Sequence, residues 1–358
     1  MKIFVAKENH SIEKRVSITP QSMCGLSCEF LVEEDAGILA GFSNESYRDV
    51  AQVGSLELIR DADLVVSINP LDSSVLENIK HGASYIVVHD YLENRDHLKV
   101  LCSKGANYHA LNLIPRTTKA QYMDVLSSQA TLAGYRAVID IFYYSSKVSA
   151  MLTTAAGTVK PANVLVVGAG VAGLSAIATA KRLGSIVYAL DSRSSAKEQI
   201  ESLGGIFVEV DSSASTDSVY ATTMGKDYAE KQRAAILNII NKIDVIITTA
   251  QIPFKKAPII ITKEMLDKAK EGCVVLDLAS RTGGNCELTS HNEIIAYNDK
   301  KIVSSADVIN NVAHDASILL SNNIKNWLKL YEQNKDDDII SQTLLLSGGD
   351  ILRHEFFS

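Results

Sequence analysis

Cysteine is scarce in this sequence, and its distribution excludes two kinds of stabilising site. The 358 residues contain five cysteines, an odd number: Cys24, Cys28, Cys102, Cys273 and Cys286. They form no CxxC pair and no zinc-binding spacing, so we expect neither a disulfide framework nor a metal site. This usage predicts a reducing compartment.

Long apolar runs and basic segments are also missing, and the N-terminal residues do not predict a signal peptide. The nearest candidate for a membrane span, 164–180, is broken by glycines, and a spanning helix needs about 20 apolar residues. Charged residues stand near the N-terminus where a signal peptide would need an apolar core. The formal net charge is −7, and no Lys/Arg-rich run occurs. We therefore expect a cytoplasmic protein that neither spans a membrane nor binds nucleic acid.

Short apolar runs alternate with helical patterns along the whole chain, and this alternation predicts an α/β fold with parallel sheets. The chain is long enough for about two domains. Its runs form two series, one at 2–7, 28–34, 62–68, 83–90 and 107–113, the other at 163–168, 185–191, 205–211, 244–250, 273–279 and 301–307.

Two helical patterns connect the series. Residues 117–148 carry apolar residues at helical spacing without proline, and 316–334 form a second helical pattern. We expect two Rossmann-like domains with parallel sheets, joined by long helices. The predicted domains are residues 1–126 with 313–358, a bridging helix at 127–139, and a nucleotide-binding domain at 140–312.

Residues 164–191 have the order expected of a dinucleotide-binding unit: apolar strand, glycine-rich turn, helix, second strand, acid. Gly168 permits the tight turn, Gly170 lets a pyrophosphate approach the backbone, and Gly173 lets the helix pack closely on the sheet. The pyrophosphate would lie at the helix N-terminus. Asp191 ends the second strand, where a carboxylate accepts hydrogen bonds from an adenine ribose and disfavours a 2′-phosphate, so NAD is favoured over NADP.

Two alternatives remain open for this segment. Arg193, two residues beyond the acid, could meet a 2′-phosphate, although a solvated or adenine-stacking arginine fits as well. The glycines could also belong to an ordinary strand-to-helix turn without a ligand.

Several contiguous motifs resemble the alanine dehydrogenase and proton-translocating transhydrogenase superfamily. They are KIFVAKE with RVSITP, IPRTTKAQYMDVLSSQATLAGYRAVID, TTAAGTVKPANVLVVGAGVAGLSAIATAKRLG, ATTMGKDYAEKQ and DLASRTGGNC. The match resembles most the NAD(H)-binding domain I of the transhydrogenase α subunit. The resemblance implies a homodimeric subunit that works with partner chains carrying the NADP(H) site and the membrane helices, on the cytoplasmic face of the inner membrane.

The two branches of this superfamily require different residues. By resemblance to alanine dehydrogenases, Arg15 stands at the place of the arginine that binds the substrate carboxylate, and His89 at that of the catalytic histidine. The family's substrate-binding lysine falls on Ser67, and its active-site aspartate falls near Arg281. A neutral hydroxyl and a cation cannot supply these two functions, so the sequence disfavours an amino-acid dehydrogenase.

The transhydrogenase pattern PRxxxxQxxDxxS, by contrast, is complete. Its residues, which hold the nicotinamide end of the nucleotide in that family, are Arg116, Gln121, Asp124 and Ser127, and we predict them as the catalytic set. If the segment is helical or turn-like, the last three share one face. The alternative is that they form a helix cap and a solvated polar face.

A further segment, 216–234, interrupts the strand–helix series. By resemblance it is a loop that closes over bound nucleotide through Tyr220 and Met224; the alternative is a surface element without a role. The predicted cofactor-binding residues are Gly168, Gly170, Val171, Gly173, Asp191, Ser192, Arg193, Tyr220, Met224 and Ala250.

The sequence also departs from the family. Glu287 replaces a proline in GGNCEL, and 304–317 lacks the usual asparagine–proline pair. An alanine-dehydrogenase-like oxidoreductase and an NAD-sensing module without hydride chemistry remain the alternative functions.

Overall fold

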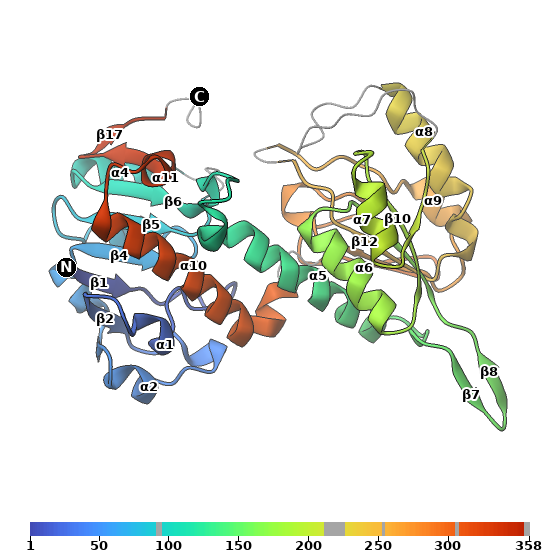
Figure 1. The fold of residues 1–358 in the computed structure, drawn as a ribbon, viewed down its shortest axis with the longest axis horizontal. Helices are drawn as coiled ribbons and strands as arrows, with labels where there is room; N and C mark the ends of the chain where they lie inside the picture. The colour runs from blue at the N-terminus through green and yellow to red at the C-terminus, as the bar shows by residue number, and fades with distance from the viewer. Residues whose placement is uncertain (91–94, 211–225, 253–254, 305–307, 354–358) are drawn as a thin grey trace. The chain divides into compact units, whose positions relative to one another are not determined.

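The computed structural model describes residues 1–90, 95–210, 226–252, 255–304 and 308–353. These residues form two compact units (Figure 1). Unit 1 contains Met1–Gln129 and Val312–Ser358, and unit 2 contains Ala130–Asn311. The chain therefore leaves unit 1 and returns to it after unit 2 is complete.

Unit 1 is built on an eight-stranded sheet with the order β17-β16-β6-β5-β4-β1-β2-β3. The six strands from β6 to β3 are parallel, while β16 and β17 are antiparallel additions at one edge. The strands are β1 Lys2–Val5, β2 Glu29–Glu33, β3 Gln52–Gly54, β4 Leu64–Ser67, β5 Ser84–Val87, β6 Asn107–Ala110, β16 Leu344–Ser347 and β17 Asp350–Ile351.

Helices cover both faces of this sheet, as parallel strands require. They are α1 Pro20–Met23, α2 Asn44–Arg48, α3 Ser73–Leu76, α4 Asp96–Ser103, α10 Ala313–Gln333 and α11 Asp338–Thr343, with short 3-10 helices η1 Ile38–Ala40, η2 Leu56–Asp61, η3 Leu111–Leu113 and η4 Gln121–Met123. Helix α10 buries Leu320, Ile324 and Trp327 in the same core as Ile3 and Val66. Their spacing of three and four residues places them on one helix face.

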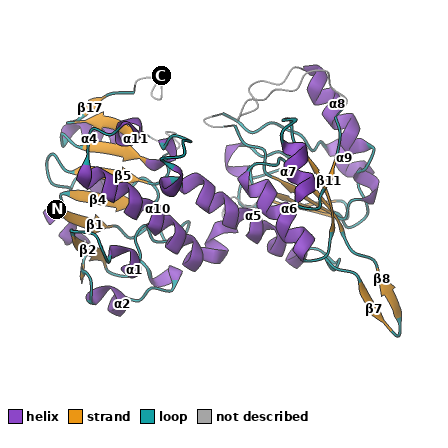
Figure 2. Cartoon of the chain, viewed as in Figure 1, coloured by secondary structure: helices purple, strands orange, loops and turns teal. Residues whose placement is uncertain are grey.

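Unit 2 has a seven-stranded sheet with the order β11-β10-β9-β12-β13-β15-β14, in which only β14 is antiparallel among the described strands. The strands are β9 Asn163–Val167, β10 Ile186–Leu190, β11 Ile206–Phe207, β12 Val245–Thr248, β13 Val274–Asp277, β14 Ile294–Tyr297 and β15 Lys300–Val303. Its helices are α6 Val171–Arg182, α7 Ala196–Ser202, α8 Lys226–Leu237 and α9 Lys263–Lys268, with η5 Ile240–Lys242 and η6 Ser280–Thr282. The short η7 Val308–Val312 leads back to unit 1. Both sheets are rich in parallel strands, which confirms the predicted fold class (Figure 2).

Helix α5 (Val125–Tyr144) crosses the boundary between the units. It begins eight residues later than the 117–148 helical pattern, after the short η4. Its later residues Ala137, Val138 and Ile141 are buried in the core of unit 2, and Ser175 of α6 donates a hydrogen bond to the Thr131 carbonyl at 2.6 Å. The unit boundary therefore falls within the helix, at 129/130, inside the predicted bridging segment 127–139.

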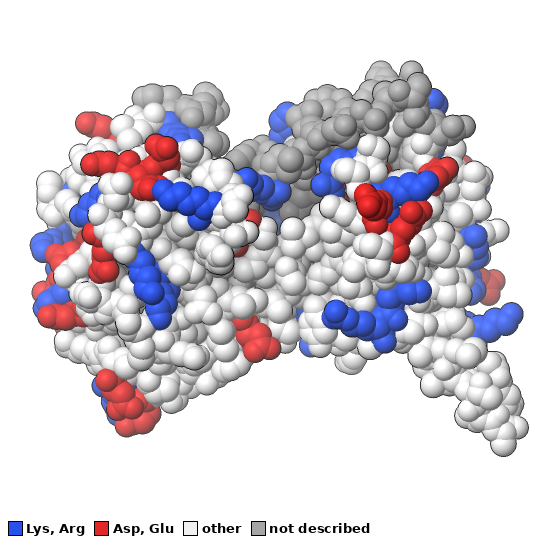
Figure 3. Space-filling model, viewed as in Figure 1, with Lys and Arg blue, Asp and Glu red and all other residues white. Residues whose placement is uncertain are grey.

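Some elements were not predicted from the sequence. They include β3, β14 and a hairpin made by β7 Leu152–Thr154 and β8 Gly157–Val159. The hairpin projects from the sheet of unit 2 (Figure 2), and all six strand residues are exposed. On the face shown in Figure 3 it carries no charged side chain.

Candidate functional site

The glycine-rich turn follows β9 and opens α6. Gly168 has φ +95°, a left-handed value that favours glycine, and its N–H donates to the Leu190 carbonyl at 2.9 Å. Thr249, after β12, donates through Oγ1 to the Gly168 carbonyl at 3.1 Å. The turn is thus held from both neighbouring strands.

The other two glycines differ in what surrounds them. A Cβ at Gly173 would overlap the carbonyl oxygen of Gly168 and lie 2.8 Å from its carbonyl carbon. A Cβ at Gly170 would meet no atom of the described residues within 4 Å. Gly173 therefore allows the close approach of helix to strand, whereas the backbone at Gly170, the N-cap of α6, is open to a ligand. Val171 is the first residue of α6. The N–H groups of the first turn and the positive end of the helix dipole therefore point toward the space beside Gly170.

Three strand ends meet beside this turn, because β9 lies between β10 and β12 with Val167 in register with Leu190 and Thr248. Asp191 and Ala250 therefore flank the turn at the carboxyl edge of the sheet, where ligands bind in open α/β sheets. Asn285 fixes the Ala250 segment: its Oδ1 accepts from Ala250 N–H at 2.9 Å and its Nδ2 donates to the Ala250 carbonyl at 2.8 Å.

Sequence reasoning missed the roles of Asn285 and Asp277. Buried Asp277 accepts hydrogen bonds through Oδ2 from the N–H of Asn285 at 2.7 Å and of Cys286 at 3.0 Å, and from Thr289 Oγ1 at 2.6 Å. The signal was present in DLASRTGGNC, a motif that contains both residues. Asp277 therefore holds the loop that in turn holds Ala250.

The carboxylate of Asp191 is already hydrogen-bonded. Its Oδ2 accepts from Ala169 N–H at 2.7 Å, and its Oδ1 accepts from the N–H and the Nε of Arg193, both at 2.9 Å. Arg193 Nη2 donates to Asp191 Oδ2 at 3.2 Å and to the Ala169 carbonyl at 3.0 Å. The hydrogen bond with Asp191 raises the pKa of Arg193 above its ordinary value. Ser192 lies between them, partly buried.

The four residues of the PRxxxxQxxDxxS pattern lie in unit 1. Arg116 and Gln121 are exposed, and Asp124 and Ser127 are partly buried. Gln121 is in η4, Asp124 follows in extended backbone and Ser127 is in α5, so the segment is not one continuous helix. Asp124 accepts from Ser127 N–H at 2.9 Å and Oγ at 2.6 Å. The helix-cap alternative therefore describes part of what Asp124 does, since this contact closes the first turn of α5.

The loop that carries these residues is held from the C-terminal segment of unit 1. Asn323 and Asn326 of α10 donate to the Tyr122 carbonyl at 2.9 and 3.1 Å. Lys119 contacts Asp337 at 2.6 Å, and Met123 is buried in the core. The exposed Gln121 thus stands on a well-anchored backbone.

Arg15, Ser67 and His89, the positions that the sequence resemblance compared with alanine dehydrogenases, have the following surroundings. The guanidinium of Arg15 contacts Glu13 through Nε at 2.8 Å and Nη2 at 2.7 Å, and it donates to Gln129 Oε1 at 2.8 Å. Ser67 is buried, with Oγ 2.6 Å from the Asn69 carbonyl and 2.7 Å from Tyr85 Oη. His89 lies just after the buried strand β5.

Buried Glu8 lies beside this cluster and accepts from the N–H of Ile68 at 2.6 Å and of Asn69 at 3.2 Å. Burial, joined by the charge of Glu13, raises the pKa of Glu8 to about 7, although these hydrogen bonds lower it. Burial alone would raise the pKa of Glu13, but the charge and hydrogen bonds of Arg15 lower it below its ordinary value.

Of the remaining positions singled out in the sequence, two lie outside the residues that the structure describes and three lie within them. Tyr220 and Met224 lie outside the described residues. Glu287, the departure from the family, accepts from Lys263 N–H at 2.8 Å at the start of α9, and Arg281 lies exposed in η6. His314 contacts the Ala40 carbonyl through Nδ1 at 2.8 Å.

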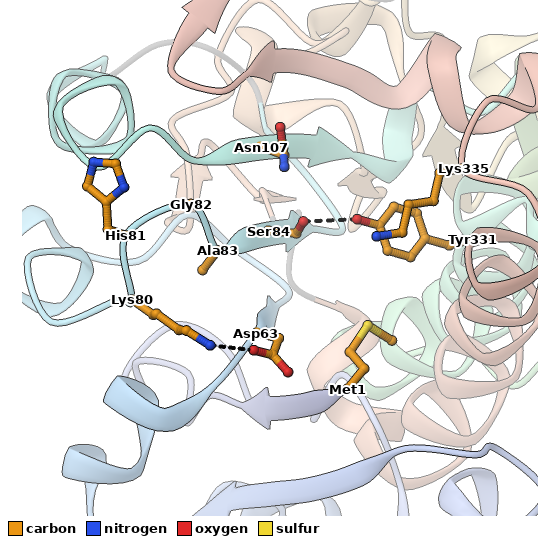
Figure 4. A pocket seen from close by; sticks show the side chains of 10 residues that line it. All are labelled: Met1, Asp63, Lys80, His81, Gly82, Ala83, Ser84, Asn107, Tyr331 and Lys335. Carbon is orange, nitrogen blue, oxygen red and sulfur yellow. Dashed lines mark hydrogen bonds and ion pairs between the residues drawn. The ribbon is translucent and has the colours of Figure 1, made fainter.

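A cavity of about 350 Å³ lies elsewhere in unit 1 (Figure 4). It is lined by the amino ends of the strands, including Met1, Asp63, Ser84 and Asn107, with Tyr331 of α10. Ligands in open α/β folds bind at the opposite, carboxyl edge. We therefore do not assign this cavity to the nucleotide site.

Comparisons with known proteins identify the family. "Alanine dehydrogenase/PNT, N-terminal domain" matches residues 4–133, and "Alanine dehydrogenase/PNT, C-terminal domain" matches residues 137–354. The chain belongs to the alanine dehydrogenase/PNT family. The resemblance predicted from the motifs is thereby confirmed, and with it membership of an oxidoreductase family.

Among its relatives is an NAD(P) transhydrogenase subunit alpha polypeptide of Rhodospirillum rubrum, 41% identical over 375 aligned positions that cover 98% of each chain. A similar solved structure is a transhydrogenase from Sinorhizobium meliloti, with a TM-score of 0.91, 37% identity and coverage of 98% of this chain and 100% of that one. An L-alanine dehydrogenase gives a TM-score of 0.82 at 20% identity, covering 100% and 99%, and this likeness concerns the fold alone.

Membrane-spanning helices and metal clusters are both absent from the described residues. None of the helices there combines the length and apolar character that crossing a membrane requires. Across the same ranges, no cluster of three or more His, Cys, Asp or Glu side chains could hold a metal ion.

Proposed function

We propose that this protein is the NAD(H)-binding component of a proton-translocating transhydrogenase, and that it passes hydride between NAD(H) and NADP(H) held by a partner domain. The observation that carries the proposal is the turn at 168–173. Gly173 lets α6 pack closely on the sheet, and the open Gly170 at the N-terminus of α6 suits a pyrophosphate. The acid at the end of the adjoining strand suits the adenine ribose, so the two together favour a dinucleotide. The kinship with transhydrogenase α subunits supports the same function.

Each part of the nucleotide has a candidate partner. The pyrophosphate would lie on Gly170 and Val171, and the adenine ribose on Asp191 and Ser192. Ala250, held by Asn285, would border the site at the next strand. We propose that Tyr220 and Met224 close over the bound nucleotide and exclude water.

The nicotinamide end would be held by Arg116, Gln121, Asp124 and Ser127. Arg116 can pair with a pyrophosphate oxygen, Gln121 can orient the carboxamide, and the hydrogen-bonded Asp124–Ser127 pair can fix the ring face. The nicotinamide itself supplies the hydride. Transfer between two rings needs alignment and no side-chain acid or base, so the work of these residues is positioning.

The partners follow from this function. We propose that chains carrying an NADP(H) site and the membrane helices hold this protein at the cytoplasmic face of the inner membrane. We also propose a homodimer, to which the β7–β8 hairpin contributes. Met151, Leu152 and Val159 are 63%, 49% and 50% exposed on it, and an uncharged apolar strip of this kind is typical of a surface that another protein covers.

The test is hydride transfer in a reconstituted complex. NADH deuterated at the reactive carbon is mixed with this protein, an NADP-binding transhydrogenase domain and an oxidised NADP analogue. We expect the label to appear on the NADP analogue, with no exchange into solvent. Loss of label to water would contradict direct transfer. NADH binding without transfer to any competent partner would favour the NAD-sensing alternative.

A further inference from the structure

Arg193 is hydrogen-bonded to the carboxylate of Asp191, which the proposed function assigns to the adenine ribose. A carboxylate offers about four lone-pair positions, and four N–H groups already use them: those of Ala169, of the Arg193 backbone, and Nε and Nη2 of the Arg193 side chain. A ribose diol can bind Asp191 only if some of these contacts open.

The two side-chain contacts are the ones that can open. The N–H groups of Ala169 and of Arg193 belong to the backbone, in the glycine turn and in the bend after β10, so they cannot swing away as a side chain can. The guanidinium is attached by a flexible chain and its side chain is 22% exposed, whereas that of Asp191 is 9% exposed. Nε and Nη2 contact one carboxylate oxygen each, a two-point arrangement that a vicinal diol would also adopt.

We propose that Arg193 is a specificity-determining latch: its guanidinium competes with the adenine ribose for Asp191 and, once displaced, places a cation beside the ribose 2′ position. The inference rests on the proposed NAD(H) site. It goes further, because cofactor choice then depends on the pair and not on Asp191 alone. Arg193 weakens NADH binding through competition, and it reduces the penalty that Asp191 imposes on a 2′-phosphate.

Competition and charge can be separated with two substitutions. Arg193→Gln removes both the positive charge and the two-point contact of the guanidinium with Asp191. Arg193→Lys keeps the charge but loses the planar two-point contact. A partly exposed ion pair contributes up to about 1 kcal/mol, which is a factor of about five in a dissociation constant. We therefore expect both variants to bind NADH about two- to fivefold more tightly, and only Arg193→Gln to bind NADPH about three- to tenfold more weakly.

Titration calorimetry of the full chain with NADH and with NADPH makes the measurement, and 5′-AMP and adenosine 2′,5′-bisphosphate isolate the adenosine end. Arg182→Gln is the matched control. It removes the same charge from an exposed position in the last turn of α6, and it should change neither affinity. Asp191→Asn tests the carboxylate and should weaken NADH binding in the wild-type and Arg193→Gln backgrounds alike.

The outcomes distinguish failure of the latch from failure of the proposed NAD(H) site. Weaker NADH binding in both Arg193 variants would make Arg193 a direct nucleotide contact and overturn the latch while leaving the NAD(H) site intact. An unchanged ratio of NADH to NADPH affinity would overturn it as well. A wild-type chain that binds no NADH would overturn the proposed function itself, and the latch with it.

Discussion

Replacing Gly173 with alanine tests whether close packing of α6 on β9 builds the nucleotide site. The added Cβ would overlap the Gly168 carbonyl oxygen and lie 3.2 Å from Thr249 Oγ1. Because carbon atoms pack at about 3.5 Å or more, the start of α6 must move by roughly 1 Å. Overpacking of this kind costs about 1–3 kcal/mol, and the shift also moves the N–H groups proposed to hold the pyrophosphate.

Gly170→Ala is the matched comparison. Gly170 has φ −72°, which alanine adopts freely, and its Cβ would meet no described atom within 4 Å. Loss of a favourable N-cap residue and the lower entropy of the unfolded chain nearly cancel, so stability should change by less than about 1 kcal/mol. NADH binding should nevertheless weaken about tenfold or more, because the methyl group lies where the pyrophosphate approaches.

The assay can assign the loss of stability to one unit. Trp327, the single tryptophan of the sequence, is buried in the core of unit 1, so its fluorescence follows the unfolding of that unit in urea. Far-UV circular dichroism follows both units. Gly173→Ala should shift a dichroism transition to lower urea and leave the fluorescence transition in place, while Gly170→Ala shifts neither. Wild-type stability in Gly173→Ala, or wild-type NADH affinity in Gly170→Ala, would refute the reasoning.

Three further predictions concern chemistry and pH. Gln121→Asn should leave NADH affinity nearly intact but slow hydride transfer by up to about a hundredfold, because a carboxamide displaced by about 1 Å misaligns the rings; a weaker affinity with an unchanged rate at saturation would make Gln121 only a binding contact. The isolated chain should show no pyruvate- and ammonium-dependent oxidation of NADH, because the resemblance places Ser67 and Arg281 where an alanine dehydrogenase needs a lysine and an aspartate. The absorbance of the reduced nicotinamide measures this reaction, and robust reductive amination would overturn the prediction. Burial raises the pKa of Glu8 from 4.5 to about 7, so the folded protein retains a proton that the unfolded chain releases. That contribution to stability is complete below about pH 4.5 and is lost as the pH rises through about 7. The free energy of unfolding of the wild type minus that of Glu8→Gln should therefore fall between about pH 5 and pH 8, and parallel profiles would contradict the assignment.

Much of the fold and part of the site could be predicted because their signals are local. Parallel strands buried on both faces are continuous apolar runs, and β9, β10 and β12 appear as such in the sequence. The glycine turn combines backbone requirements with fixed spacing, so Gly168 and Gly173 are readable from the chain alone. Short, polar or exposed elements such as β3 and the β7–β8 hairpin carry no such signal.

What side chains contact across the sequence was decided only by the tertiary structure. The sequence places Asp191 at a strand end, but it does not show that the guanidinium of Arg193 contacts the Asp191 carboxylate. It places Arg15 in a family motif, but it does not show the contact with Gln129, 114 residues away. Asn285 likewise reaches Ala250 only because β12 and β13 are neighbours. Helices and strands can be predicted because their hydrophobic periodicity is a property of neighbouring residues in the sequence. The partner of a polar side chain depends instead on which distant segments the sheet brings together.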